Sequence, residues 1–269
     1  MTAEERCFME KLRLDRFIAN QTDMPRSEVK KMIYWGKVTL NGKAVHSCDL
    51  KIIPDNDTVT LKGETIQYKK FIYVMLNKPK GYVCSTKDGV SPTVISLLPP
   101  ELQKKNLFPA GRLDKDTTGF VFLTNDGELT HRILSPKKHI AKYYFVKLAQ
   151  PYSQDYQDRF LNGIIIDGGE KCLPAKVCGI PNRPEYALLE LFEGKFHQVK
   201  RMFSAVGNSV TELSRVQMGN LPMSRNIGLG EHLEIMHNDV ENLLISSSFE
   251  DVRRKICSDF WSYLINNNL

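Results

Sequence analysis

The sequence predicts an α+β protein in which a small N-terminal domain precedes a larger second domain. The chain has 269 residues, more than a single hydrophobic core usually serves. Apolar residues recur first at helical spacing and then in the alternation of a hairpin, and further along they form continuous runs typical of buried strands. With 42% hydrophobic and 25% charged residues, the composition is that of a folded globular protein and not of a disordered chain.

Two short helices followed by a hairpin are expected over residues 12–60. Gly36 ends the second helix, and Asn41-Gly42 supplies the residues that favour a tight hairpin turn. Residues 61–70 are polar and break the periodicity, so we place a linker there. The apolar residues at helical spacing that predict the helices are Leu14, Phe17, Ile18, Val29, Met32 and Ile33.

The positive charge of the chain is concentrated in this first domain. The net charge is +6, and residues 11–43 hold eight Lys/Arg against three Asp/Glu, which gives them +5. A small basic module is typical of proteins that neutralise nucleic-acid phosphates, although a charge run is more often a solvated face. The cations that fall off the apolar stripes, and that we expect to contact RNA, are Arg13, Arg16, Arg26, Lys30, Lys31 and Lys37.

Neither a membrane span nor a metal site is expected. No stretch approaches the roughly 20 apolar residues that a membrane span needs, and the charged N-terminus is not followed by the apolar region of a signal peptide. The 6 cysteines and 6 histidines lack the spacing of zinc ligands or of a disulfide framework. We therefore expect a cytoplasmic protein without a metal, in which Cys84 is a buried structural residue.

The second domain opens with a strand, Phe71 to Leu76, that ends in the turn Asn77-Lys78-Pro79-Lys80-Gly81. Polar turn residues at a strand end often line a site, but taken alone this turn is more often an exposed loop.

The most informative segment is a loop, residues 111–119, that precedes a second buried strand, Phe120 to Thr124. Three interpretations compete for its carboxylates, Asp114 and Asp116. A magnesium site for phosphoryl transfer fits poorly, because no further acidic cluster completes it. A structural role in capping backbone amides suits Asp116. For Asp114 we favour a carboxylate nucleophile that reaches a sugar or a base ring.

A third segment, residues 193–207, predicts an amphipathic helix. Lys200 falls at the border of its apolar face and can border a site, whereas Lys195, His197 and Arg201 point toward solvent or RNA phosphate. A surface helix with snorkelling basic side chains is the competing interpretation. The residues that share the apolar face are Phe196, Val199, Met202, Phe203 and Val206.

Residues 12–60 resemble the S4 RNA-binding domain, on the stretch LRLDRFIANQTDMPRSEVKKMIYWGKVTLNGKAV. Residues 71–238 resemble the catalytic domain of the RsuA/RluB/RluE/RluF family of pseudouridine synthases, with the small-subunit branch the most similar. The resemblance implies a mixed, mainly antiparallel sheet with flanking helices. It rests on YVMLNKPKGYVCST, AGRLDKDTTG, TNDGELTHRILSP, AKYYFV and EGKFHQVKRMFSAVGN, in this order.

The resemblance also implies roles for particular residues. Asp114 is the expected nucleophile, Tyr144 stacks on the target base, and Lys200 pairs with the aspartate. Relatives often have arginine at the position of Lys200, so a bidentate pair is not available to this chain. Leu213 packs beneath the site. The further residues expected to contact RNA are Lys78, Lys80, Arg112, Lys142, His197, Gln198, Arg201 and Arg215.

The expected function is the isomerisation of a uridine in 16S rRNA, by a monomer that acts on an assembling small subunit and needs no cofactor. The resemblance leaves open whether Asp114 attacks the ring, attacks C1′ or acts through a glycal. A 23S rRNA enzyme of the same family and a non-catalytic rRNA-binding assembly protein are the alternatives.

Beyond about residue 240 the resemblance fades, and residues 239–269 read as an added helical extension that docks on the catalytic domain. The residues expected along the docking face are Phe249, Val252, Ile256, Phe260 and Leu264.

Overall fold

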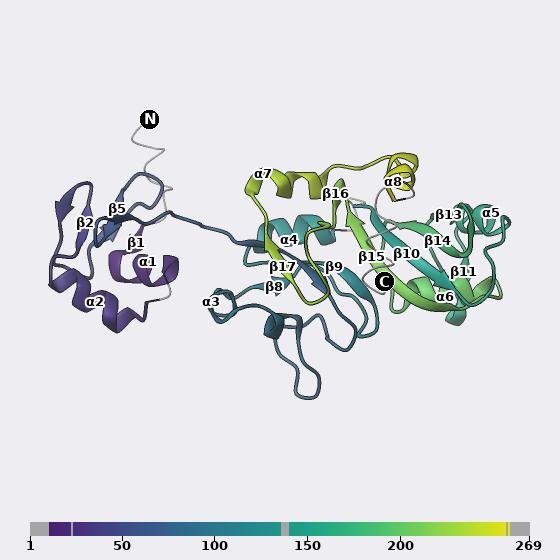
Figure 1. Ribbon diagram of the computed structural model, residues 1–269, viewed down its shortest axis with the longest axis horizontal. Coiled ribbons are helices and arrows are strands. Elements are labelled where there is room, and N and C mark those ends of the chain that lie inside the picture. The colour runs from purple at the N-terminus through teal and green to yellow at the C-terminus, as the bar shows by residue number, and fades with distance from the viewer. Residues whose placement is uncertain (1–10, 23, 136–139, 257, 259–269) are drawn as a thin grey trace. The chain divides into compact units, whose positions relative to one another are not determined.

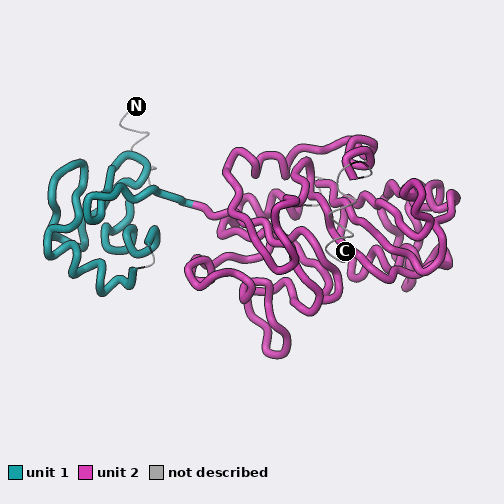
Figure 2. Tube along the Cα trace, in the orientation of Figure 1, with its two compact units in different colours: residues 1–70 teal, residues 71–269 magenta. Residues whose placement is uncertain are grey.

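The computed structural model describes residues 11–22, 24–135, 140–256 and 258, and the chain divides into two units, residues 1–70 and 71–269 (Figure 2). The predicted α+β class is confirmed. In the described parts of the chain, no helix has the length and apolar character needed to cross a membrane.

The first unit contains the predicted helices and hairpin. Asn41 and Gly42 have φ angles of 49° and 81°, as a tight hairpin turn requires. The helices pack on the small sheet through a core that includes Leu14, Ile18 and Val29, each fully buried. The sheet has the order β3-β2-β5-β6, and β1 pairs with β4. The elements are β1 Leu12–Arg13, α1 Leu14–Gln21, α2 Arg26–Tyr34, β2 Val38–Leu40, β3 Lys43–Ala44, β4 Lys51–Ile52, β5 Val59–Leu61 and β6 Glu64–Thr65.

Most of the segment expected as a linker belongs to this first unit. Strand β6 pairs with β5, and the ring of Tyr68 lies 5.8 Å from that of Phe17. The side chain of Gln21 accepts a hydrogen bond from the backbone N–H of Lys69 and donates one to its carbonyl oxygen. The segment is polar because β6 is an exposed edge strand, which the loss of periodicity did not distinguish from a linker.

The second unit is built on a sheet that has nine strands within the described residues (Figure 1). Its order is β13-β14-β10-β15-β9-β7-β17, with β16 beside β15 and β8 beside β9. The β9–β15 pair is parallel and the other described pairs are antiparallel. The mixed, mainly antiparallel sheet is thus confirmed. The strands are β7 Tyr73–Lys78, β8 Phe108–Pro109, β9 Thr118–Thr124, β10 Lys142–Leu148, β13 Lys176–Ile180, β14 Arg183–Leu191, β15 Val210–Met218, β16 Leu221–Pro222 and β17 His232–Glu234.

Helices cover both faces of this sheet, so the central strands β7 and β9 bury both sets of their alternating side chains. Along β10, Tyr144 and Val146 enter the core shared with α3, α5 and α6, whereas Tyr143 and Phe145 enter the core shared with α4, α7 and α8. A separate two-stranded sheet, β11–β12, packs through Ile166 into the core that contains Tyr144 and Val146. The remaining elements are α3 Pro100–Gln103, α4 Gly127–Leu134, α5 Tyr156–Leu161, β11 Ile165–Ile166, β12 Glu170–Lys171, α6 Gln198–Ala205, α7 His237–Val240 and α8 Phe249–Lys255.

The described part of the C-terminal extension packs on the core of the second unit. Val252 and Ile256 are 1% and 4% exposed within the second core, and Phe249 packs against it. The hydroxyl of Tyr143 on β10 donates a hydrogen bond to the carbonyl oxygen of Ser247, which precedes α8. Phe260 and Leu264, expected on the same face, lie outside the described residues.

Candidate active site

The register of the sheet brings five positions into one row across the strands. Lys78 on β7 faces Gly119 on β9, Gly119 faces Arg215 on β15, and Arg215 faces Tyr144 on β10, which faces Leu189 on β14. The loop that carries Asp114 leads directly into β9. The row therefore places the predicted nucleophile, just before the start of β9, and the predicted stacking tyrosine, on β10, at two strands of one sheet that are separated only by β15.

Gly119 is needed because β9 and β15 approach each other closely. Its φ angle is +96°, and a Cβ atom there would lie 2.3 Å from the carbonyl oxygen of Arg215 and 2.6 Å from Oγ of Ser214. Both contacts are far below any that a real side chain makes, so the glycine permits the parallel pairing at the base of the loop.

Lys78 binds the backbone of the loop that carries Asp114. Its ammonium is fully buried and donates hydrogen bonds to the carbonyl oxygens of Pro79 (3.1 Å), Lys115 (3.2 Å) and Thr117 (2.7 Å). Burial lowers the pKa of Lys78 to about 8, although nearby Cys84, Asp116 and Asp114 act in the opposite direction. We predicted an RNA contact for Lys78, and this is wrong because the side chain turns inward to bind backbone carbonyls.

The same loop is held by two contacts from the turn that follows β7. The backbone N–H of Gly81 donates to the carbonyl oxygen of Lys115 (2.8 Å). The N–H of Leu113 donates to Sγ of Cys84 (3.3 Å), which is 7% exposed. Cys84 is thus the buried structural cysteine that we expected, and it fixes the residue before Asp114.

Asp114 lies at the surface of this framework. Its side chain is 29% exposed, and Nε2 of His197 lies 3.8 Å from its Oδ1. His197 has a left-handed backbone (φ 49°) and stacks on Phe196 with ring centroids 3.8 Å apart. Phe196 is 75% exposed and precedes the helix, so its predicted place on the apolar face of α6 is wrong. The partial exposure of Asp114 leaves its carboxylate open to a substrate.

The expected ion pair between Lys200 and Asp114 is replaced by a different one. Nζ of Lys200 lies 2.5 Å from Oδ2 of Asp116. Burial acts to raise the pKa of Asp116, but the hydrogen bond and charge of Lys200 outweigh it and lower the pKa. The helix α6 therefore holds the loop through Asp116, two residues after the predicted nucleophile.

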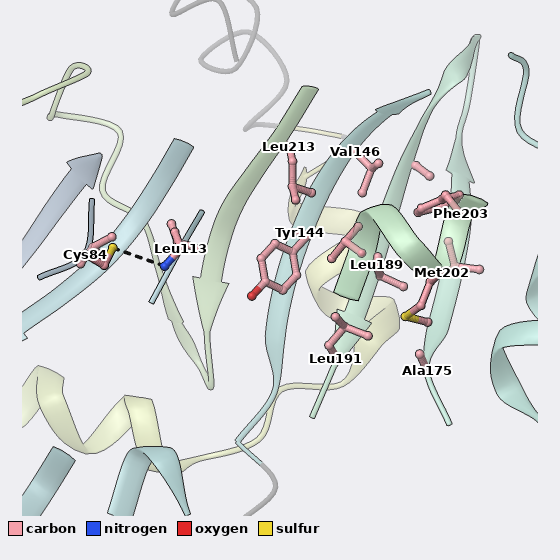
Figure 3. Close-up of a cluster of buried hydrophobic side chains, with 14 of the residues drawn as sticks. Cys84, Leu113, Tyr144, Val146, Ala175, Leu189, Leu191, Met202, Phe203 and Leu213 are labelled. Carbon is pink, nitrogen blue, oxygen red and sulfur yellow. Dashed lines mark hydrogen bonds between the residues drawn. The ribbon is translucent and has the colours of Figure 1, made fainter. Parts of the chain in front are cut away.

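Tyr144 is set into the apolar core beside the loop, with 8% of its surface exposed. Leu113, Leu189 and Leu213 belong to the same buried cluster and lie around its ring in Figure 3. Leu213 faces Val146, two residues further along β10 than Tyr144, and its carbonyl oxygen accepts a hydrogen bond from Oγ1 of Thr118. Leu213 is thus buried in the cluster that contains Tyr144 and is hydrogen-bonded to the start of β9, and its role beneath the site stays a prediction.

Two of the residues expected to contact RNA from α6 are bound to the protein instead. Gln198 is 4% exposed, and its side chain donates to Oε1 of Glu193 (2.7 Å) and accepts from the N–H of Lys195 (2.9 Å). Arg201 pairs with Asp167 and, at 3.0 Å, with Glu170 of the β11–β12 hairpin. These predictions are wrong because local acidic residues already satisfy both side chains.

Arg215 and Lys142 also turn into the protein. Arg215 is 1% exposed and its Nε donates to the carbonyl oxygen of Phe120 (2.8 Å), while Nη2 has no hydrogen-bond partner among the described residues. Nζ of Lys142 donates to the carbonyl oxygen of Ile140 (3.3 Å), and burial, with the charge of Arg215, lowers its pKa to about 8. The cations expected near the site that remain exposed are Lys80 and Arg112.

The basic surface of the first unit contains a buried carboxylate that the sequence reading missed. Asp15 is fully buried and binds both Arg13 (3.2 Å) and Arg26 (3.0 Å). Burial acts to raise the pKa of Asp15, but the two guanidinium groups outweigh it and lower the pKa. Asp15 thus fixes two of the six cations that we predicted to bind RNA. Its position next to Leu14, on the buried side of α1, is the feature of the sequence that could have indicated a buried carboxylate. The other four, Arg16, Lys30, Lys31 and Lys37, are exposed.

The described residues contain no group of three or more His, Cys, Asp and Glu side chains placed to hold a metal ion. Four features of the described side chains are available for chemistry at the site. They are a half-exposed carboxylate, an adjacent imidazole, an aromatic ring at the edge of the core and a loop fixed by two lysines.

The family model of RNA pseudouridylate synthases matches residues 72–205. The chain is 42% identical over 234 residues to an uncharacterized RNA pseudouridine synthase, YtzG, of Bacillus subtilis, covering 86% of this chain and 98% of that protein. It is 37% identical to ribosomal small subunit pseudouridine synthase A of Escherichia coli, covering 87% of this chain and all of the relative. A crystal structure of a pseudouridylate synthase superposes with a TM-score of 0.61 at 39% identity, covering 86% of this chain and 99% of that one. The protein belongs to the RNA pseudouridylate synthase family, which confirms the family resemblance and the enzyme class.

Proposed function

We propose that this enzyme converts one uridine of 16S ribosomal RNA to pseudouridine, with Asp114 as the nucleophile. The observation that carries the proposal is the loop geometry: a half-exposed Asp114 held by Lys78, Cys84 and Lys200 at the edge of the core that contains Tyr144. The 16S assignment is supported by similarity over nearly the whole length of several relatives named for the small ribosomal subunit.

The reaction needs only the groups that the site offers. The bond between N1 of uracil and C1′ breaks, the base turns, and C5 bonds to C1′; the proton on C5 is released and N1 takes up a proton. Atoms and charge balance with no net oxidation, reduction or hydrolysis, so the proposed reaction requires no cofactor. Attack of Asp114 on C1′, attack on the ring and a glycal route all start from the same bound uridine.

Each neighbouring residue has a proposed role. The exposed edge of Tyr144 receives the uracil once it has left its stack in the RNA. His197, beside Asp114, contributes positive charge near the carboxylate when protonated. Lys200 acts through Asp116 and positions the loop, so we assign it a positioning role. Leu213 supports the floor under the loop.

The RNA itself is proposed to bind through both units. In the second unit the exposed Lys80 and Arg112 flank the catalytic loop. The first unit, whose helices and hairpin fit an S4 domain, offers the exposed cations of α1 and α2. We propose a cytoplasmic monomer whose substrate is rRNA in an assembling small subunit, where unpaired regions are still accessible to the enzyme.

The test is tritium release from rRNA transcripts labelled with [5-³H]uridine, run separately on 16S and 23S RNA. We expect release from 16S RNA with the wild-type enzyme and none with Asp114→Asn, which keeps the size of the side chain but removes its charge. Asp116→Asn is the matched control, because it alters the same loop two residues away, and it should slow the reaction without abolishing it.

The other outcomes distinguish the remaining possibilities. Release from 23S RNA alone would move the substrate to the large subunit and leave the mechanism intact. Release that survives in Asp114→Asn would refute the nucleophile. If wild-type enzyme released no tritium from either transcript or from ribosome assembly intermediates, while still binding them, a non-catalytic assembly role would replace the proposal.

A further inference from the structure

A groove of about 540 Å³ lies on the first unit, where the end of α2 meets the small sheet. The exposed indole of Trp35 forms one side of it, and the side chains of Lys37 and Lys62 stand at its rim. The residues that line the groove are Met32, Trp35, Gly36, Lys37, Thr39, Lys62 and Gly63.

The backbone fixes this groove in place. The N–H of Trp35 donates to the carbonyl oxygen of Lys31 (2.9 Å), and the N–H of Lys62 donates to the carbonyl oxygen of Lys37 (2.8 Å). Gly36 has a φ angle of +66°, and the ring of His46 lies 3.0 Å from the place where its Cβ would be. Trp35 and the two lysines are thus presented from a preformed turn and not from a free loop.

Trp35 is 59% exposed, although an indole is among the largest apolar surfaces that a chain can expose. Trp35 does not belong to the core of the first unit, which is formed by residues of α1, α2 and the strands. An exposed aromatic residue between cations is the arrangement by which proteins bind unpaired nucleotides, with the base stacked on the ring and the phosphates near the cations.

We propose that this groove binds an unpaired nucleotide of the RNA substrate, with its base stacked on Trp35 and the adjoining phosphates held by Lys37 and Lys62. The described lining contains no carboxylate, so its charge is complementary to a phosphate chain. The inference rests on the proposed function only in taking RNA as the partner. It adds a site for single-stranded RNA in the unit that does not carry Asp114.

The experiment uses the fluorescence of Trp35 in the full-length enzyme. The sequence has two tryptophans, so Trp261→Phe leaves Trp35 as the only one. An oligouridylate of about ten nucleotides, within the ~4–16 nucleotides that single-strand sites span, should quench the emission. A fully paired RNA duplex should quench it far less at equal nucleotide concentration.

Matched variants separate stacking from general charge. Trp35→Ala should weaken oligouridylate binding, measured by anisotropy of a labelled RNA, by about 5- to 150-fold, the range expected for one lost base–aromatic stack. Tyr34→Ala is the control, because Tyr34 is 74% exposed on the same helix but does not line the groove. Lys62→Gln should reduce the salt dependence of binding by about one phosphate contact, whereas Lys43→Gln removes an exposed lysine of the same unit outside the groove and should reduce it less.

Two results would overturn the inference: unchanged RNA affinity in Trp35→Ala, or equal losses in Trp35→Ala and Tyr34→Ala. Quenching is also measured in the Asp114→Asn enzyme, because RNA binding at Trp35 does not depend on the proposed nucleophile. This measurement tests the groove separately from the proposed reaction. Quenching without tritium release from the wild type would support the groove and count against the proposed reaction. Tritium release without quenching would do the reverse.

Discussion

Lys78 illustrates how a single buried cation can organise a catalytic loop. Two of its three hydrogen bonds reach the carbonyl oxygens of Lys115 and Thr117, the residues on either side of Asp116, and the third reaches that of Pro79. A carbonyl oxygen buried without a donor is costly, so removal of the ammonium affects the loop more than the loss of one surface charge would.

We predict that Lys78→Met destabilises the second unit by about 1–3 kcal/mol and lowers kcat by more than it changes KM. The reason is that the loop loses its anchor while the RNA-binding surface is retained. Urea unfolding and tritium release would measure the two effects. Lys80→Met, which alters an exposed lysine two residues away, should leave the free energy of unfolding nearly unchanged.

The depressed pKa of Lys78 adds a pH signature. The pKa of Lys78 is about 8 in the folded protein, whereas an unburied lysine, as in the unfolded chain, has a pKa of 10.5. Between these two pH values the unfolded chain therefore binds more protons than the folded protein does. The stability of the wild type relative to Lys78→Met should therefore rise as the pH increases from about 8 to 10.5. A constant difference across that window would show that the charged form of Lys78 is not disfavoured by folding.

For single residues, the sequence predicts some roles and contact partners correctly and others not. The Gly-Arg-Leu-Asp stretch was sufficient to identify Asp114 as the candidate nucleophile, and the structure leaves it accessible. Lys78 and Lys200 were assigned wrong partners because their partners lie far away in sequence. Lys78 lies in a polar turn, and such a position predicts an exposed side chain. Asp114 and Asp116 are separated by one residue, so the sequence does not indicate which of them pairs with Lys200 on the distant helix α6.

Among the secondary-structure elements, the parallel pair β9–β15 determines where the loop can sit. The two strands approach each other closely there, because the Cβ position of Gly119 would lie only 2.3 Å from a backbone oxygen of β15. Backbone atoms on both strands are hydrogen-bonded within the sheet, so neither can yield to a side chain.

We predict that Gly119→Ala destabilises the protein by about 3 kcal/mol or more, since the substitution combines a steric clash with a positive φ angle. Gly127→Ala is a suitable control, because the Cβ position of Gly127, at the start of α4, has nothing within 4 Å, and it should be neutral or stabilising by up to about 1 kcal/mol. Thermal unfolding of the two variants would provide the comparison. Similar midpoints would mean that β9 can move away from β15.

Elements whose cause is local were predicted from the sequence. The helices α1 and α2 follow from the spacing of residues such as Leu14 and Ile33, and the hairpin follows from Asn41-Gly42. The strand order of the large sheet and its one parallel pair depend on contacts between residues about a hundred positions apart, as between Thr118 and Ser214. Periodicity contains no information on such pairings, and here only the family resemblance indicated a mixed sheet.

For the molecule as a whole, the connection between the units is short. Gln21 binds Lys69 within the first unit, and Asn125 accepts a hydrogen bond from the N–H of Ile72 within the second (2.9 Å). Only Lys70 and Phe71 lie between these two attachment points. A fully extended chain covers at most about 3.6 Å per residue, so the attachment points stay within about 11 Å of each other.

We predict that about ten Gly and Ser residues inserted between Lys70 and Phe71 raise KM for rRNA and leave kcat nearly unchanged. A longer connection lowers the effective concentration of the catalytic unit at RNA held by the first unit, while each unit keeps its own core. Steady-state tritium release would measure both constants. An equal-length insertion in the exposed turn around Val90, which is 95% exposed, is the control, and an equal rise of KM there would refute the explanation.

The short connection has a consequence for the choice of target. An enzyme that reads little sequence around its uridine can still be specific if a second RNA element must lie within a fixed radius of the reacting base. The short connection at residues 70 and 71 would then limit that radius. Substrate choice would depend on how the RNA is folded at the moment of encounter as much as on its sequence, and a uridine in the right sequence but at the wrong distance would be left unmodified.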